Sequence, residues 1–371
     1  MTGQKGATGR VEQLTGLRFF AALLVFAVHF RWDTSPEALR TLAQQGYVGV
    51  SFFFMLSGFV LTHSYGRRIR AGQVSFPSYV LLRIARLTPL HVLTGLPFVY
   101  FAIVQNEAIY SEAFGVMKTL LNLSFLQSWV PVSDYYFSLN APSWSLSDEM
   151  AFYVAFFFLV TLAPRRLLRL TLGLGGVVLI SALLVQVFLG ETRFFGKYPL
   201  SHWLFYVFPG FRILEFMIGM LLHDLWQRGK RLPAGLIPLS YLLLFAAMWI
   251  APAVADPFRY SLFYLPVIML FFYAHLSERS AWTGFYASSL LVLLGNASFA
   301  FYLIHQPMLH LMNLFLRGAM PADAVFFPVS LGITVVASVL LYKLYEMPAE
   351  RALKGLIRRR FATPRPQAER V

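Results

Sequence analysis

Long apolar stretches are the feature of this chain that most restricts its fold. They lie at 14–31, 46–65, 87–105, 148–163, 171–189, 200–222, 235–251, 260–276, 289–313 and 325–345. A helix needs about 20 mostly apolar residues to cross a bilayer, and in lipid only helices and closed barrels satisfy the backbone hydrogen bonds. Hydrophobic residues make up 58% of the 371 residues and charged residues only 13%, well below the share of a soluble domain. We therefore predict an all-α, polytopic transmembrane helical bundle with about ten spans.

The charge distribution predicts the orientation of this bundle. Ten spans place both termini on one side of the membrane, and most of the 31 Lys and Arg residues then fall in the loops and tail of that side. Because cytoplasmic loops carry the excess of positive charge, we predict that the N- and C-termini are cytoplasmic. Topology and attraction to anionic membrane lipid then explain the formal net charge of +14. We expect a multi-pass protein of the bacterial inner (plasma) membrane that does not bind nucleic acid, and the pattern fixes no oligomeric state.

The chain divides into a cytoplasmic N-terminal segment at 1–13, a transmembrane domain at 14–345 and a basic cytoplasmic tail at 346–371. The first span lacks a convincing signal-peptide cleavage site, so we expect it to be retained. The segment 114–130 contains Lys118, and we interpret it as an interfacial or re-entrant piece, with an eleventh span as the alternative. The chain has no cysteine, which excludes a thiolate nucleophile, and it has no HExxH pattern, so we expect no metal centre.

Two ionisable residues lie within the first span. Arg18 and His29 are eleven residues apart, close to three helical turns, so both face roughly one side of a helix, about 16 Å apart along its axis. An ionisable residue inside a membrane helix is costly and therefore indicates a functional site. The imidazole of His29 can act as a general base on a hydroxyl group, or attack an acyl group itself. The alternative is a structural histidine at the membrane interface.

Arg83 and Arg86 lie at the predicted cytoplasmic entrance to the third span, in RIARLTPL. Their spacing of three residues places both on one helix face. Guanidinium groups bind phosphates through paired hydrogen bonds, so the two side chains could receive a phosphorylated cofactor from the cytosol. The alternative is ordinary cytoplasmic positive charge. That alternative explains Arg67, Arg68 and Arg70 well, but it explains a pair directly beside the span less well.

A polar cluster opens the fourth span in APSWSLSDEMAFY, residues 141–153. Helix capping explains one or two such residues but not the whole cluster. A carboxylate at this depth can orient His29 or help to deprotonate an acceptor hydroxyl group, and we take Glu149 as the candidate for that role. The candidate pocket residues of the same cluster are Ser143, Trp144, Ser145 and Asp148.

Two later spans also contain polar residues. Arg212 and Glu215 are three residues apart in the sixth span, where they form either a structural ion pair or a wall of the site. His305 lies in the ninth span, three residues after Tyr302. We take Arg212, Tyr302 and His305 as further candidates for the pocket wall.

The longest predicted outer loop, 106–147, combines acidic residues with aromatic rings. Its acidic and aromatic residues include Glu107, Glu112, Asp134, Trp129 and Tyr135. Such a loop suits a sugar-like acceptor, because rings stack on the apolar faces of sugars. An aromatic belt at the membrane interface explains the same composition equally well.

Six segments occur in an order that resembles the successive motifs of the membrane acyltransferase-3 family. They are LTGLRFFAALLVFAVHF, VSFFFMLSGFVLT, RIARLTPL, APSWSLSDEMAFY, FRILEFMIGMLL and GNASFAFYLIHQP. The resemblance covers about residues 14–345. Members of this family O-acylate sugars of lipopolysaccharide, exopolysaccharides and peptidoglycan, and some acylate macrolides.

The resemblance implies a ten-helix core, an acyl-CoA donor in the cytoplasm and an acceptor hydroxyl group at the outer face. It maps an Arg-X10-His motif onto Arg18 and His29, and an Arg-X-X-Arg motif onto Arg83 and Arg86. It also maps a Ser-Trp-Ser-Leu-Ser-x-Glu motif onto Ser143–Glu149.

The family often has a second acidic residue directly after that glutamate. This chain has Met150 there, so we carry over no two-carboxylate role.

We therefore expect a membrane O-acyltransferase that moves an acetyl group from acetyl-CoA to a glycan or glycolipid. His29 would be the base or the transient acyl acceptor, Glu149 its helper, and Arg83 and Arg86, with Arg18, would bind the donor. One alternative is an acyltransferase that acts on a small metabolite such as a macrolide. The other is a transporter or flippase of a polar lipid or sugar, although the chain lacks the internal repeat that many such carriers have.

Overall fold

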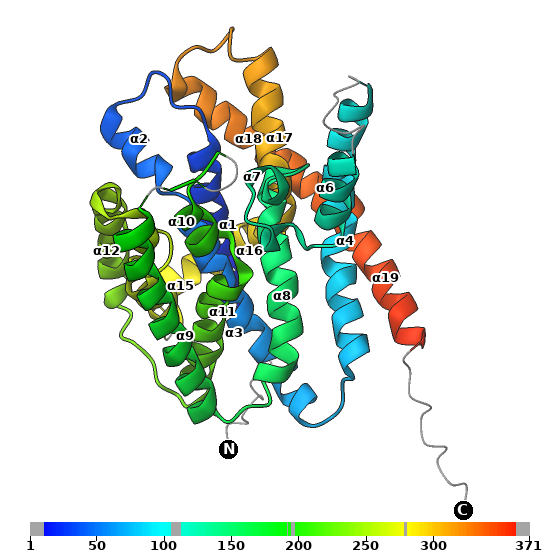
Figure 1. Cartoon of the computed structure of the whole chain (residues 1–371), viewed down its shortest axis with the longest axis vertical. Helices are drawn as coiled ribbons and strands as arrows, with labels where there is room; N and C mark the ends of the chain where they lie inside the picture. Colours follow the sequence, from blue (N-terminus) through cyan, green and yellow to red (C-terminus); the bar gives the residue numbers. More distant parts are fainter. Residues whose placement is uncertain (1–10, 105–112, 191, 194–196, 278–279, 361–371) are drawn as a thin grey trace, which may run out of the picture.

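The computed structural model describes residues 11–104, 113–190, 192–193, 197–277 and 280–360, and in this part of the chain it contains helices and no strand (Figure 1). The all-α prediction is confirmed. The site is built on α1 (Glu12–His29), α3 (Val48–Arg70), α4 (Phe76–Val104), α8 (Trp144–Leu159), α11 (Pro209–Gln227), α16 (Ser289–Asn296), α17 (Ser298–Phe315), α18 (Asp323–Leu341) and α19 (Met347–Arg360).

The remaining helices surround this set. They are α2 (Glu37–Gln44), α6 (Ala113–Leu123), α7 (Ser133–Tyr136), α9 (Pro164–Leu184), α10 (Leu200–His202), α12 (Leu236–Ile250), α13 (Asp256–Arg259), α14 (Leu265–Ala274) and α15 (Ala281–Tyr286). Six short 3-10 or π-helical turns complete the described residues: η1 (Gln127–Trp129), η2 (Ala141–Ser143), η3 (Val185–Leu189), η4 (Trp203–Val207), η5 (Ala251–Ala253) and η6 (Tyr342–Glu346).

Within the described residues, six helical segments are long and apolar enough to cross a membrane, and a seventh is formed if α16 and α17, which meet at a 62° bend, count as one span. Other predicted spans are shorter: α8 has 16 residues and α14 has 10. The count of ten spans and the cytoplasmic position of both termini therefore stay predictions. Helix α6 has 11 described residues, fewer than a span needs. This length agrees with an interfacial or re-entrant segment at 114–130.

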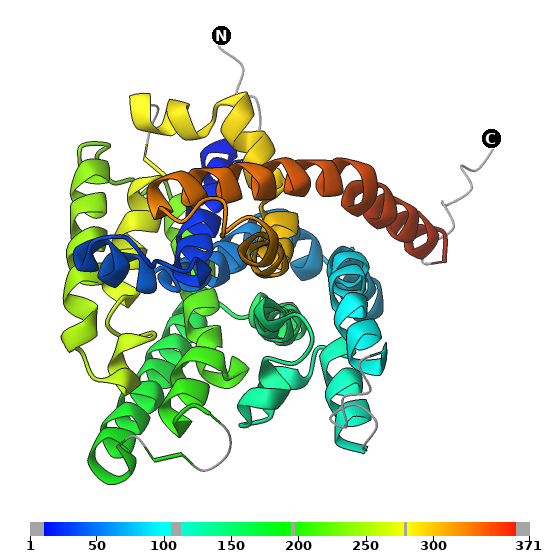
Figure 2. The ribbon, with the colours of Figure 1, turned by 90° about the horizontal axis from the view of Figure 1, so that it is seen from above.

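The helices are arranged around α1 and α3. Figure 1 shows α4, α6 and α19 along one side of the bundle and α9 and α12 along the other. Seen from above, α18 and α19 continue through η6 as one long rod across a third side (Figure 2). Residues 346–360, which we assigned to the tail, therefore form a helix, and α19 packs on α4.

Helices α3 and α11 pack closely, because two glycines let their backbones approach each other. A Cβ atom at Gly58 would lie 2.0 Å from the carbonyl oxygen of Phe216, and one at Gly219 would lie 1.9 Å from the carbonyl oxygen of Met55. Both distances are far inside van der Waals contact, so only glycine fits. Small residues that permit close backbone approach are a common basis of helix association in membranes.

A fully buried ion pair fastens the same two helices. Arg212 and Glu215 on α11 are both 0% exposed, and the Arg212 Nη1 to Glu215 Oε1 distance is 2.8 Å. Arg212 also donates a hydrogen bond of 2.9 Å to the hydroxyl group of Ser51 on α3, and Ser261 donates one of 2.9 Å to Glu215. A buried pair persists only when further hydrogen bonds compensate its desolvation, and here Ser51 of α3 and Ser261 supply them.

We expect Gly219→Ala to destabilise the protein by about 1–3 kcal/mol or more, because α3 and α11 must separate to admit the new methyl group. The matched control is Gly176→Ala on α9, where a Cβ atom would meet nothing within 4 Å. That change should leave stability equal or raise it by about 0.5–1 kcal/mol. The loss of the monodisperse size-exclusion peak after heating in detergent gives a thermal midpoint for each variant. Equal midpoints for the two variants would contradict the close-packing argument.

Candidate active site

A cavity of about 160 Å³ lies between α1, α3, α4, α8 and the α16–α17 bend. It brings together residues that are far apart in the sequence. We call it the arginine cavity, because the guanidinium groups of Arg18, Arg83 and Arg86 line it. Its other polar lining residues include Ser145, Glu149, Tyr153 and Tyr302, and most of the rest are apolar. The structure thus brings six predicted site residues to one cavity: Arg18, Arg83, Arg86, Ser145, Glu149 and Tyr302.

The structure gives Arg86 two carboxylate partners that we did not predict. Its Nη1 atom pairs with Glu346, and it lies 3.0 Å from Glu350 Oε2. Glu346 is 1% exposed, so this contact is inside the protein. Lys354 in turn pairs with Glu350. The charge of Arg86 is therefore already compensated by residues at the start of α19.

Arg83 is held by aromatic rings. It donates a hydrogen bond of 2.7 Å to the hydroxyl group of Tyr65, and its guanidinium carbon lies 4.8 Å from the centre of the Tyr65 ring. The rings of Tyr79 and Tyr153 lie 5.9 Å away. Such cation–π contacts hold a cation without cancelling its charge.

Glu149 faces the same cavity from the second turn of α8. Its Oε2 atom accepts a hydrogen bond of 2.8 Å from the hydroxyl group of Tyr153, one helical turn further along. Arg86, Arg18 and Arg83 all act on it electrostatically. Glu149 does not make the contact with His29 that we considered, because it lies in the arginine cavity and His29 does not.

His29 is the last residue of α1 and is exposed, and its side-chain partner is a second histidine. Its Nδ1 atom lies 2.9 Å from the carbonyl oxygen of Val25 and 3.2 Å from Nε2 of His305, which is fully buried on α17. The two rings lie 4.9 Å apart in an edge-to-face arrangement. His29 and His305 do not line the arginine cavity.

The hydrogen bonds of the two histidines define one consistent pair of tautomers. His305 Nδ1 lies 2.5 Å from the carbonyl oxygen of Tyr302, which can only accept, so the proton of His305 is on Nδ1. His305 Nε2 is then an acceptor, and the Nδ1–H group of His29 donates to it and to Val25. This assignment leaves Nε2 of His29 with the free lone pair, the nitrogen that can take a proton.

Tyr302 links the arginine cavity to the histidines. Its hydroxyl group lies 2.8 Å from Oγ of Ser145 on the cavity wall, and its carbonyl oxygen accepts from His305. Tyr302 also donates a hydrogen bond of 3.1 Å to the carbonyl oxygen of Pro142. The two ends of the site are therefore joined through one residue of α17.

The remaining candidates from the polar cluster are buried and do not line the cavity. The hydroxyl oxygen of Ser143 accepts from Asn122 at 3.2 Å, and Trp144 packs edge to face on Phe54. Asp148 is 0% exposed, and neither carboxylate oxygen has a hydrogen-bond partner among the described residues. Arg212 also lies away from the cavity, so its role is the structural ion pair described above.

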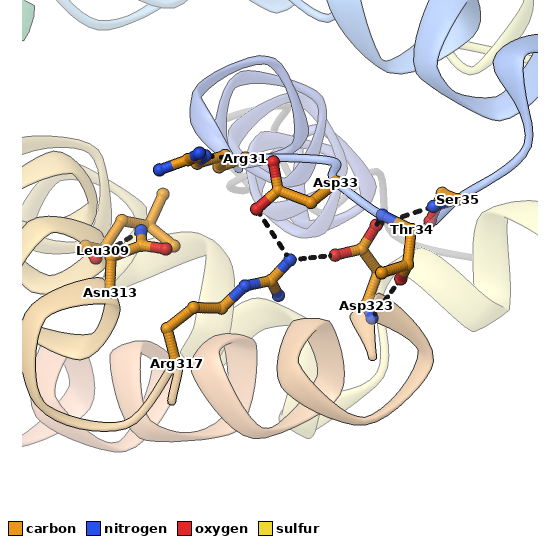
Figure 3. A network of polar contacts seen from close by, with 8 residues as sticks. All are labelled: Arg31, Asp33, Thr34, Ser35, Leu309, Asn313, Arg317 and Asp323. Carbon is orange, nitrogen blue, oxygen red and sulfur yellow. Dashed lines mark hydrogen bonds and ion pairs between the residues drawn. The ribbon is translucent and has the colours of Figure 1, made fainter. Parts of the chain in front are cut away.

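The segment after His29 is pinned to the start of α18 by a polar network (Figure 3). Asp323 Oδ2 accepts hydrogen bonds of 2.8 and 2.9 Å from the backbone N–H groups of Thr34 and Ser35. Arg317 bridges Asp323 at 2.6 Å and Asp33 at 3.0 Å. Burial alone would lower the pKa of Arg317, but its hydrogen bonds to the two carboxylates outweigh this and raise that pKa. The network fixes the position at which the chain leaves α1.

The predicted acceptor loop is only partly described. Glu107 and Glu112 lie outside the described residues. Tyr136 is buried, and its hydroxyl group lies 3.3 Å from Nδ1 of His202, whereas Trp129 is exposed. The role of this loop in acceptor binding stays a prediction.

Sequence reasoning missed Tyr65, Tyr153, Glu346 and Glu350. Only Tyr153 had a local signal, because it follows Glu149 by four residues and therefore shares its helix face. No group of three His, Asp or Glu side chains with the spacing of a metal site occurs in the part of the chain that the structure describes.

We expect Asp323→Asn to destabilise the protein by about 2–4 kcal/mol, because Arg317 loses a buried charge partner and two backbone N–H groups lose a charged acceptor. Asp224→Asn is the control. Asp224 pairs with Arg228 on the surface, with side-chain exposures of 34% and 59%, and its removal should cost at most about 1 kcal/mol. Thermal midpoints in detergent compare the two, and a loss for Asp323→Asn no larger than that of the control would contradict the pinning role.

Comparison with known proteins places the chain among acyltransferases. A model of the family described as an acyltransferase domain matches residues 11–343. The chain is 30% identical to the acyltransferase MdmB of Streptomyces mycarofaciens over an alignment that covers 93% of this chain and 92% of that protein. No solved structure gives a significant match.

Two other relatives are named as O-acetyltransferases. A putative peptidoglycan O-acetyltransferase of Bacillus subtilis, YrhL, is 27% identical over 81% of this chain and 48% of its own length. A putative O-acetyltransferase of Staphylococcus aureus (strain COL) is 23% identical over 91% of this chain and 57% of its own length. The chain thus spans about half the length of these two proteins.

Proposed function

The chain belongs to this acyltransferase family, and from that premise we propose that it moves an acetyl group from cytoplasmic acetyl-CoA to a hydroxyl group of a glycan or glycolipid at the outer face of the membrane. The observation that carries the proposal is the connection between the arginine cavity and the His29–His305 pair through Tyr302. Several helices of the chain are long and apolar enough to cross a membrane, which supports a multi-pass membrane protein. In the proposed orientation, the donor would reach the site from the cytoplasm and the acceptor from the outer face.

His29 is the proposed base. The acceptor hydroxyl group attacks the thioester carbonyl carbon while Nε2 of His29 takes its proton. The tetrahedral intermediate then collapses, the carbon–sulfur bond breaks, and the proton on His29 passes to the departing CoA thiolate. The same nitrogen can instead attack the thioester carbon and displace the CoA thiolate, so that His29 carries the acetyl group. The acceptor hydroxyl group then attacks this acetyl group, the bond to nitrogen breaks, and the hydroxyl proton passes to the thiolate.

The arginine cavity has a complementary role in this scheme. Arg18 and Arg83 can act on the donor while its thioester end occupies the cavity, because fixed cations act strongly in a site of low dielectric constant. Tyr153 donates a hydrogen bond to Glu149 and so fixes the position of this carboxylate beside the arginines. The apolar lining accommodates the acetyl group. Arg86 acts through its carboxylate partners as a structural member of the wall.

We expect His29→Ala to lower the rate of acetyl transfer by about 10²–10⁴, because general base catalysis contributes that much. The control is His310→Ala, an exposed histidine on the same helix as His305. Transfer from radiolabelled acetyl-CoA by the purified chain in lipid nanodiscs measures both, with an extract of cell-surface glycolipid as acceptor.

Several outcomes of this assay discriminate between functions. Near wild-type transfer by His29→Ala would remove the proposed base. A wild-type protein that neither transfers nor hydrolyses acetyl-CoA would point to a carrier instead of an enzyme. Mass spectrometry of surface glycans and of secreted metabolites, with and without the chain, identifies the acceptor class.

His305 is proposed as a positioning residue, since its Nε2 atom holds the Nδ1–H group of His29. Glutamine places an acceptor oxygen near the position of Nε2, whereas the shorter asparagine does not. We therefore expect His305→Asn to lower kcat by about tenfold to a hundredfold with little change in KM for the donor, and His305→Gln to retain more of the activity. Equal losses in the two variants, or a change confined to KM, would contradict this role.

A further inference from the structure

A second, larger cavity opens where α3, α8 and α11 end and α9 begins. Figure 1 shows the end of α8 and the start of α9 at the lower end of the bundle, which we predict to be cytoplasmic. Its volume is about 830 Å³. We call it the basic cavity, because Arg67, Arg68 and Arg70 of α3 line it together with His63 and His223. His63 Nδ1 lies 3.3 Å from His223 Nε2, so the two imidazoles form one wall. Ordinary cytoplasmic positive charge explains exposed arginines, but it does not explain a cavity of this size with a histidine wall.

The one acidic residue that lines this cavity is already compensated. Asp224 Oδ2 lies 2.8 Å from Nη2 of Arg228. The three arginines of the lining therefore leave a strong excess of positive charge. Such a site suits a ligand with several phosphate groups.

The arginine cavity alone is unsuited to the phosphates of the donor. Its volume of about 160 Å³ is below the 300–1,000 Å³ typical of sites for drug-sized ligands, and a coenzyme thioester is larger than such ligands. Around it, the carboxylates of Glu149, Glu346 and Glu350 compensate most of the positive charge of its arginines, although Lys354 also pairs with Glu350. A small cavity whose charge is mostly compensated fits the uncharged thioester end.

The two cavities are adjacent along α3. Leu61 lines the arginine cavity and Thr62 lines the basic cavity. Tyr65 connects their charged groups, because its ring lies 4.8 Å from the guanidinium carbon of Arg83 on one side and 5.9 Å from that of Arg68 on the other. A long flexible ligand can thus have its charged end in one cavity and its uncharged end in the other.

We infer that the basic cavity binds the phosphate-bearing nucleotide part of acyl-CoA, with its phosphate groups on Arg67, Arg68 and Arg70. The inference rests on the proposed function, since it names where the charged part of that donor lies. The same phosphate chemistry is offered by an anionic lipid headgroup, and the experiment separates the two sources.

The test compares two double variants of the full chain in nanodiscs. Arg67→Gln/Arg68→Gln removes charge from the basic cavity, and Arg165→Gln/Arg166→Gln removes equal charge from the same end of the bundle outside its lining. Calorimetric titration with adenosine bisphosphate, the nucleotide part of CoA, and with acetyl-CoA measures Kd. We expect the first variant to weaken both ligands by at least about tenfold and the control by less than about twofold. Equal weakening, or none in the first variant, overturns the inference.

Two further arms keep this outcome separate from the proposed function and from lipid binding. Transfer from N-acetylcysteamine thioester, which lacks the nucleotide, should fall less in the first variant than transfer from acetyl-CoA. Transfer from neither donor by the wild-type protein would instead reject the proposed function. If adenosine bisphosphate does not bind the wild type, while phosphatidylglycerol in the nanodisc raises the thermal midpoint of the wild type and not of the first variant, the cavity holds a lipid headgroup and the inference is wrong.

Discussion

The charges of Arg212, Glu215 and Arg86 are compensated among the apolar helices, and this compensation determines how the bundle is joined. The desolvation of an ion is repaid only by a close partner of opposite charge and by further hydrogen bonds. Arg212 and Glu215 pair with each other and form hydrogen bonds with hydroxyl groups from two other elements, which fastens α11 to α3. Arg86 forms ion pairs with Glu346 and Glu350, which fasten α19 to α4. The long rod of α18 and α19 therefore has its position because α4 carries an arginine at the cavity wall.

The site has a cationic end and an imidazole end. Arg18 and His29 lie on one helix, but Arg18 lines a cavity with residues of α4 and α8, whereas His29 contacts His305 of α17. The 62° bend between α16 and α17 lets Tyr302 reach the arginine cavity while His305, one turn later, reaches His29. The bend thus connects the arginine cavity to His29 through Tyr302 and His305.

Local patterns in the sequence predict the elements of this protein well, and the distant contacts poorly. The apolar run and the eleven-residue spacing are enough to place Arg18 and His29 on one helix, as α1 has them. The partner of His29 is 276 residues away and the first partner of Arg86 is 260 residues away, and no periodicity carries such information. Arg86 is the instructive case: its spacing from Arg83 predicts a shared phosphate site, yet tertiary packing gives it two carboxylates instead. The span count stays a prediction, because α8 and α14 are shorter than the length that an isolated span needs.

The balance of charge around the arginine cavity also bears on catalysis. Three carboxylates compensate most of the positive charge near the cavity, so it attracts a polyanion less strongly than three free arginines would and suits an uncharged thioester. The arginines still differ in availability: Arg86 is ion-paired, while Arg83 is held by tyrosine rings that leave its charge uncancelled. Arg83 and His29 lie at different ends of the site, so Arg83 acts on the bound donor and not on the oxyanion that forms beside His29. A cation interacts only weakly with a neutral thioester carbonyl group, and the phosphates of the donor are therefore best bound elsewhere.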